Sequence, residues 1–178
     1  MKKIIVILGV FLLLVGCTNN EKDNNDINQS TENNTIVYTL NTTNDDIDMY
    51  SKEDIKIPVN NTVKIEYTSD KVSNIIETIE SDYSQATDKY FNEAYQQNKD
   101  NFVDVYNEFD GFNMKITKED KNLIIDGEYE LTSIKTSDVK SYLELSLGLV
   151  PEKYNDDGTY PLNDLEKALE EKGFAKES

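Results

Sequence analysis

The chain has 178 residues, and its 18 basic side chains are outnumbered by 35 acidic ones, for a formal net charge of −17 at pH 7. Every basic residue is lysine, and histidine, arginine and tryptophan do not occur. This composition excludes Ser-His-Asp and Cys-His catalysis, zinc sites built on imidazole, and arginine clamps for phosphate or carboxylate. A body this acidic repels nucleic acid, so we expect no nucleic-acid partner. The length suits one ordinary domain.

The N-terminus has the pattern of a secretion signal. Lys2 and Lys3 precede an apolar run over residues 4–15. This run of about 12 residues is too short to span a membrane, which takes about 20. A lipobox follows, formed by Leu14, Val15, Gly16 and Cys17. We therefore predict that residues 1–16 are a signal peptide that is removed, and that Cys17, the single cysteine, carries the lipid.

A polar segment separates the lipobox from the rest of the chain. Residues 17–34 contain one aliphatic side chain, Ile27, and cannot bury enough apolar area to offset the entropy of ordering. We predict a lipidated Cys17, a disordered tether to residue 34 and a single domain over residues 35–178. The acyl chains on Cys17 are the expected membrane attachment, at the extracellular face of the cell membrane. Frequent lysine, asparagine and isoleucine without arginine favour a low-GC Gram-positive host.

Alternating apolar residues predict strands at the start of the domain. The alternation runs through Ile36, Tyr38 and Leu40, returns after a polar break in Ile55, Ile57 and Val59, and continues in Val63, Ile65 and Tyr67. A short turn at residues 69–71 leads into a further apolar stretch over residues 72–81. We expect a hairpin here.

Between Ser84 and Phe109 the apolar period lengthens to three and four residues, which predicts the main helix. Its apolar face is expected to be buried against the neighbouring strands. The predicted contacts join Phe91, Tyr95, Phe102 and Tyr106 to Val63, Ile65, Met114 and Ile116. Gly111 ends this segment, and alternation over residues 112–131 predicts a second hairpin.

Two shorter helices are predicted near the C-terminus. Ser137 can cap the first, which Gly148 and Pro151 end, and Asn163 with Glu166 resembles the capping box of the second. Strands segregated from helices predict an α+β fold. The expected architecture is an antiparallel sheet of strand hairpins packed against one long central helix, with two shorter C-terminal helices.

Several segments in this order resemble the YehR-like small bacterial lipoproteins, a family of unknown function. The similar segments are TVKIEY, SDKV, EFDGFNMKI, LIIDGEYEL, TSDVKSYLEL and LEEKGF. The resemblance spans residues 35–174 and implies a compact strand–helix–strand core behind a lipobox and a short tether. Residues 44–61 are longer and more acidic than the family's first connection, which leaves the pairing of the first strand open. The resemblance implies no catalytic or binding residue.

The best candidate for chemistry is a row of three acids, Asp126, Glu128 and Glu130. They alternate with other residues on one predicted strand, so all three project from the same face at a spacing of about 7 Å. Glycoside hydrolysis takes two carboxyls at about 5 to 9 Å, so the spacing permits it. A strand in so acidic a chain also produces such a row as a solvated sheet face, and we favour this interpretation.

No calcium loop fits the sequence. With Gly158 at the sixth position of such a loop, Lys153 falls at the first, and lysine does not bind Ca²⁺. We predict no metal site and no cofactor. Aromatic residues are the other candidates for binding, and the tyrosines expected at the surface are Tyr50, Tyr83, Tyr90, Tyr154 and Tyr160.

The lipobox and the missing catalytic residue types favour a membrane-anchored extracytoplasmic lipoprotein that is not an enzyme. Its expected partner is a small extracellular ligand or another envelope protein, and the sequence assigns no ligand-binding residue. Two alternatives stay open. Residues 10–16, VFLLLVG, resemble the short apolar pheromones that some Gram-positive bacteria cut from lipoprotein signals, and the acidic row would serve a carboxylate-dependent hydrolase.

Overall fold

A computed structural model describes residues 33–135 and 137–177 of the chain. Its main element is a seven-stranded sheet with the strand order β4-β5-β3-β2-β1-β7, in which β6 pairs with the start of β3. All of the strand pairs are antiparallel. The strands are β1 (Asn34–Asp48), β2 (Glu53–Thr68), β3 (Lys71–Asp82), β4 (Phe112–Glu119), β5 (Asn122–Glu130), β6 (Tyr160–Pro161) and β7 (Ala175–Lys176).

The helical segments lie between and after the strands. α1 (Asp88–Asn98) continues through a π-turn, η1 (Lys99–Val103), into α2 (Asp104–Tyr106), so that 19 residues form one interrupted helix. The C-terminal helices are α3 (Ser137–Leu147) and α4 (Leu162–Glu171), with 3₁₀ turns at η2 (Leu131–Ser133) and η3 (Pro151–Lys153). In the described ranges, no helix is long and apolar enough to cross a membrane.

The helices bury their apolar residues against one face of the sheet, which we call the inner face. Side chains of that face and of all the longer helices belong to one core, which includes Tyr38, Val63, Ile65, Ile75, Phe91, Ile125, Leu143, Leu165 and Leu169. The predicted apolar face of the first helix lies against this core, because Phe91 is buried and Tyr95, Phe102 and Tyr106 pack on it while partly exposed. The other face of the sheet, the open face, is polar.

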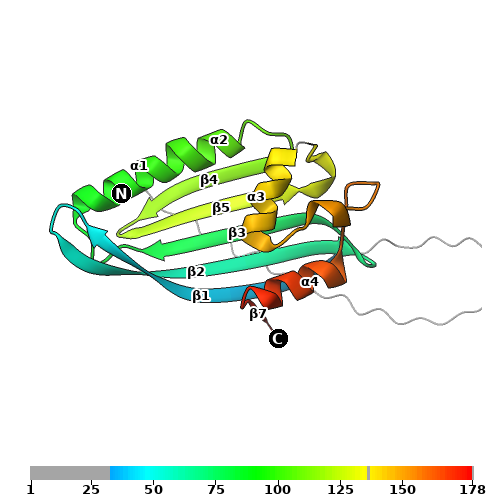
Figure 1. Ribbon diagram of the computed structural model, residues 1–178, viewed down its shortest axis with the longest axis horizontal. Helices are drawn as coiled ribbons and strands as arrows, with labels where there is room; N and C mark the ends of the chain where they lie inside the picture. The colour runs from blue at the N-terminus through cyan, green and yellow to red at the C-terminus, as the bar shows by residue number, and fades with distance from the viewer. Residues whose placement is uncertain (1–32, 136, 178) are drawn as a thin grey trace, which may run out of the picture. The chain divides into compact units, whose positions relative to one another are not determined.

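The predicted arrangement around one long central helix, with two shorter C-terminal helices beside it, is wrong. The central strands are β3 and β2, and the interrupted helix runs along the edge strand β4 (Figure 1). Five long strands at about 4.8 Å spacing make a surface about 20 Å wide, whereas a helix is about 10 Å across. One helix therefore cannot cover the inner face. α3 lies across it near β5, and α4 lies beside β1 (Figure 1).

The polar segment between Leu40 and Ile55, which we expected to interrupt the strands, is itself part of β1 and β2 up to the turn that joins them. β1 and β2 pair without interruption from Asn34 opposite Tyr67 to Asp48 opposite Glu53. At its far end this hairpin carries a second, smaller apolar cluster formed by Ile55, Ile57 and Ala86. The long hairpin thus extends the inner face beyond the main core, as far as the start of α1.

Asp48 joins the tip of this hairpin to the helix. Its carboxylate is fully buried and accepts hydrogen bonds from the backbone N–H of Tyr50 at 2.8 Å, of Ser51 at 3.3 Å and of Thr87, the N-cap of α1, at 2.6 Å. Burial raises the pKa of Asp48, but the hydrogen bonds from Thr87, Tyr50 and Ser51 outweigh burial and lower it below the ordinary value. The ionised side chain is therefore the form that the fold stabilises.

Asp48→Asn should lower the free energy of unfolding at pH 7, because an amide cannot accept from all of these donors. A carboxyl whose pKa is lowered by folding stabilises the protein above its unfolded pKa of about 3.9, and this contribution is lost as the pH falls through the folded value. Urea unfolding at pH 7, 5 and 3 should show the gap to the parent chain closing in acid. Asp45→Asn, at a carboxyl that is 81% exposed, is the control. Equal losses in the two variants would contradict the role of Asp48.

Candidate functional site

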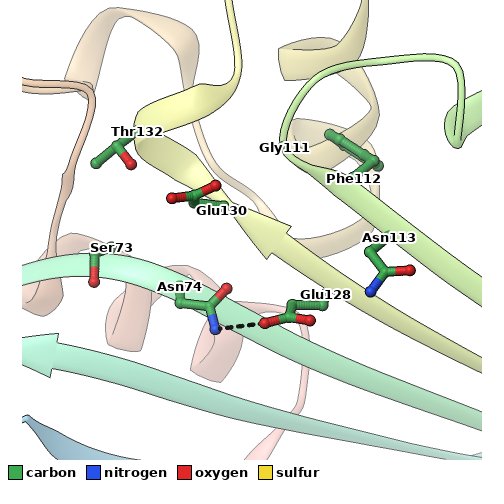
Figure 2. Close-up of a pocket in the computed structure, with 8 residues that line it drawn as sticks. All are labelled: Ser73, Asn74, Gly111, Phe112, Asn113, Glu128, Glu130 and Thr132. Atoms are coloured by element: carbon green, nitrogen blue, oxygen red, sulfur yellow. Dashed lines mark hydrogen bonds between the residues drawn. The ribbon is translucent and has the colours of Figure 1, made fainter.

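The acidic row predicted on β5 lies on the open face, beside a hollow of about 440 Å³ (Figure 2). Glu128 and Glu130 line it, while Asp126 lies outside it and accepts a hydrogen bond from the Thr78 hydroxyl at 2.9 Å. The other lining residues come from β3, from η2 and from the start of β4: Ser73, Asn74, Gly111, Phe112, Asn113 and Thr132.

Both acids of this open-face hollow are exposed and already have partners. The Asn74 amide donates to Glu128 at 3.3 Å and to Glu66 at 3.1 Å, and the Ser133 hydroxyl donates to Glu130 at 2.8 Å. Exposed carboxylates are hydrated and lack the buried setting that acid–base work near neutral pH takes. Among the described residues, no group of three or more acidic or cysteine side chains is placed to hold a metal ion. Glu128 and Glu130 are thus exposed, as predicted for a solvated face, whereas Asp126 is half-buried.

A different acid, Glu77, is buried in the middle of the inner face. It is 1% exposed and lies opposite Val63 on β2 and Gly127 on β5. The Asn61 amide donates to one of its oxygens at 2.7 Å and the Tyr129 hydroxyl donates to the other at 2.9 Å. These hydrogen bonds offset part of the free-energy cost of removing the carboxyl from water.

Gly127 makes the bond from Tyr129 sterically feasible. A Cβ at position 127 would lie 2.5 Å from the Tyr129 hydroxyl oxygen and 2.8 Å from the adjacent ring carbon. The tyrosine ring therefore lies back along β5 over the glycine, which brings its hydroxyl across to Glu77 on the neighbouring strand. The hydroxyl of Tyr142, from α3, is 3.4 Å from that of Tyr129 and extends this chain of polar groups away from the sheet.

Burial raises the pKa of the Glu77 carboxyl, and the hydrogen bonds from Asn61 and Tyr129 offset only part of that rise. Burial also raises the pKa of Tyr129, with the adjacent Glu77 carboxyl acting in the same direction. Sequence reasoning missed Glu77. Its signal is present in the sequence, because Ile75, Glu77 and Ile79 alternate on β3 and place an acid on an apolar face.

A hollow of about 590 Å³ lies between the sheet and the interrupted helix, and it begins at Ile79, the next residue after Glu77 on the inner face of β3. We call it the inner groove. Its floor is formed by Ile79 and Ser81 on β3 and by their partners on β5, Ile125 and Leu123. Its other lining residues are Asn44 from β1, Tyr83 directly after β3, Tyr142 from α3, and four residues in or next to the π-turn, Gln97, Asn98, Asn101 and Phe102.

The inner groove is uncharged. None of the described residues that line it is a lysine, aspartate or glutamate, although 30% of the chain is charged. Its polar groups are amides and hydroxyls, and Tyr142 lies at the end nearest Glu77. A volume of this size falls in the range of roughly 300–1,000 Å³ that is common for small-molecule sites.

The predicted surface tyrosines divide. Tyr50 is 36% exposed, whereas Tyr83, Tyr90 and Tyr154 are half-buried. Tyr160 is fully buried, so its predicted exposure is wrong, and its hydroxyl accepts a hydrogen bond from the Val150 backbone at 3.0 Å. The lipobox residues Leu14, Val15, Gly16 and Cys17 and the part of the predicted tether up to residue 32 lie outside the described residues. The tether was predicted to extend to residue 34, but Asn34 already belongs to β1.

No family model and no curated protein matches the chain. Among solved structures, its fold is similar to the NMR structure of the E. coli YehR protein, with a TM-score of 0.57 and 12% identity over 83% of this chain and 93% of that one. An NMR structure of a protein from Streptococcus pneumoniae TIGR4 matches with a TM-score of 0.47 and 16% identity, over 91% of this chain and 99% of that one.

The likeness to YehR confirms the resemblance found in the sequence at the level of the fold. At 12% identity it says nothing about the lipid anchor, a ligand or the role of any residue.

Glu77→Gln should raise the midpoint of thermal unfolding at pH 7, because the amide keeps an acceptor for Tyr129 without burying a charge. A carboxyl whose pKa is raised by folding leaves stability intact below its unfolded pKa of about 4.3 and reduces it as the pH rises toward the folded value. The advantage of the variant should therefore grow from pH 4 to pH 8. Tyr129→Phe, which removes a donor from the buried acid, should cost about 1–3 kcal/mol. A pH-independent difference between Glu77→Gln and the parent chain would contradict this account.

Proposed function

We propose that the protein is a lipid-anchored extracytoplasmic lipoprotein whose domain binds a ligand in the inner groove without converting it. The anchor rests on the lipobox that ends in Cys17, and the likeness of the fold to YehR is consistent with the family resemblance of the sequence. The observation that carries the binding role is the roomy, uncharged lining of the groove in an otherwise highly charged chain.

The chemistry of the groove favours binding over catalysis. Its described lining residues offer amides, hydroxyls and apolar surface, but no carboxyl, thiol or amine to act as acid, base or nucleophile. The hydroxyls of Ser81 and Tyr83 have no histidine to activate them, since the chain contains none. Glu77 lies outside the groove and is hydrogen-bonded to Asn61 and Tyr129. The acids of the open-face hollow are exposed, so a carboxylate-dependent hydrolase has less support.

Cys17→Ala should release the protein from the membrane fraction, because the acyl chains are the proposed attachment and the acidic body is repelled by an anionic bilayer. Cell fractionation with immunoblotting should find unprocessed precursor or protein in the medium. Asn28→Ala, in the predicted tether, should leave the protein on the membrane. Processed Cys17→Ala protein retained on the membrane would argue against the lipid anchor.

A panel of saccharides, cell-wall fragments and peptides should contain a ligand that stabilises the full chain. At 100 times the dissociation constant, binding should raise the unfolding midpoint by about 5–10 °C.

Two matched variants locate the site. Asn101→Arg, which places a long charged side chain on the groove rim, should abolish the shift, while Gln96→Arg, on the same helix outside the groove, should keep it. Mass spectrometry should recover the ligand unchanged. A ligand that is turned over, or whose effect survives Asn101→Arg, would contradict the proposal.

A further inference from the structure

The inner groove combines an apolar floor with an amide rim, and we propose that it takes a neutral saccharide. This inference rests on the proposed function, because it names the ligand class of the same site. The floor would lie against the C–H face of a sugar ring, and the rim would hydrogen-bond the ring hydroxyls. Three features of the groove lead to this class of ligand. They are the absence of charged side chains from its described lining, the amides of its rim (Asn44, Gln97 and Asn101), and the apolar side chains of its floor.

The lack of charged side chains along the described part of the groove disfavours ions as ligands. A charged ligand that left water for this groove would find no lysine, aspartate or glutamate among the described lining residues. Removing an ion from water without a counter-charge costs several kcal/mol. A neutral ligand avoids this cost, in contrast to the donor-rich or cationic ligand that the Glu128 and Glu130 carboxylates would select on the open face.

The rim matches hydroxyl groups. Asn44 from β1 and Gln97 and Asn101 from the interrupted helix all line the groove, and each side-chain amide has two donor hydrogens and an oxygen acceptor. A hydroxyl both donates and accepts, so one amide can bind a sugar hydroxyl in either direction. A purely apolar ligand would displace water from these amides and replace none of the lost hydrogen bonds. The ligand must therefore carry many small polar groups.

The floor of the groove offers an apolar surface for the C–H face of a sugar ring. Ile79, Leu123 and Ile125 line the bottom of the groove, and the ring of Phe102 lines its side. Phe102 and Asn101 both belong to the π-turn η1, a distortion that is frequent at functional sites. Tyr142 also lines the groove, with its ring centroid 5.2 Å from that of Phe102. A ring with one apolar face and an edge of hydroxyls fits this arrangement.

Calorimetric titration tests the proposal on the full chain in lipid nanodiscs, with empty nanodiscs as the blank. The probes are maltotriose, cellotriose and triacetylchitotriose. At least one should bind, and Gln97→Ala and Asn101→Ala should each weaken it about two- to tenfold, the loss of one hydrogen bond. Gln96→Ala, at the neighbouring amide outside the groove, should stay within twofold. Gln96, Gln97 and Asn101 are all exposed, so the three variants should fold like the parent chain.

Each other outcome overturns the saccharide class in a distinguishable way. Binding of acetyl-trialanine amide in place of the sugars, with the same loss in Gln97→Ala, would replace the saccharide by a neutral peptide and leave the proposed function intact. Binding of spermidine that is lost in Glu128→Gln would move the site to the open-face hollow. Saccharide affinity that is unchanged in both groove variants, or no heat from any trisaccharide, would refute the proposal.

Discussion

The buried carboxyl of Glu77 fixes how the sheet is assembled. It lies on the central strand, and its two partners come from the strands on either side, Asn61 on β2 and Tyr129 on β5. A slip of one residue in either pairing would turn the partner to the open face and leave the acid unpaired in the core. Gly127 adds a steric condition, since any side chain there would displace the Tyr129 ring. The register of both strand pairs, the packing of the Tyr129 ring over Gly127 and the hydrogen bonds of Glu77 are therefore mutually consistent.

The inner groove follows from covering a wide sheet with separate helices. The interrupted helix covers the β4 edge, α3 crosses the sheet near β5, and α4 lies beside β1 (Figure 1). The hydrogen bond from Thr87 to Asp48 links the hairpin tip to the start of α1 and so holds the hairpin beside the helix. Two apolar clusters result, the main core and the smaller one around Ile55 and Ile57, with the groove bordered by residues of both. Ligand access thus depends on the same contacts that stabilise the fold.

Periodicity in the sequence predicts which side of an element is apolar, and here it does so well. The helical period places Phe91 against the core, and the alternation on β5 places Glu128 and Glu130 on the solvated face. It does not predict which part of a sheet a helix covers, because this depends on the width of the sheet and on long-range pairing. The extension of β1 to Asp48 was not predicted for this reason, since the partners of Asp48 come from the turn after β1 and from Thr87 at the start of α1.

The candidate site was less predictable than the fold. The amides of the groove rim are separated by about fifty positions, between Asn44 on β1 and Gln97 on the helix, and such common residues carry no signal in the sequence. The uncharged lining of the groove can be recognised only in the folded structure, because its residues come from separate strands and helices. Glu77 differs, because its place between Ile75 and Ile79 marks it as an acid on a buried face.

Side-chain amide NMR tests the central claim most directly, because asparagine and glutamine groups line both hollows. Titration of the full chain in nanodiscs with each of the three trisaccharides should shift the amide signals of Asn44, Gln97 and Asn101, while those of Asn74 and Asn113 on the open face stay in place. Shifts confined to Asn74 and Asn113, or no shift at the groove amides with any of the three sugars, would contradict the assignment of the inner groove as a saccharide site.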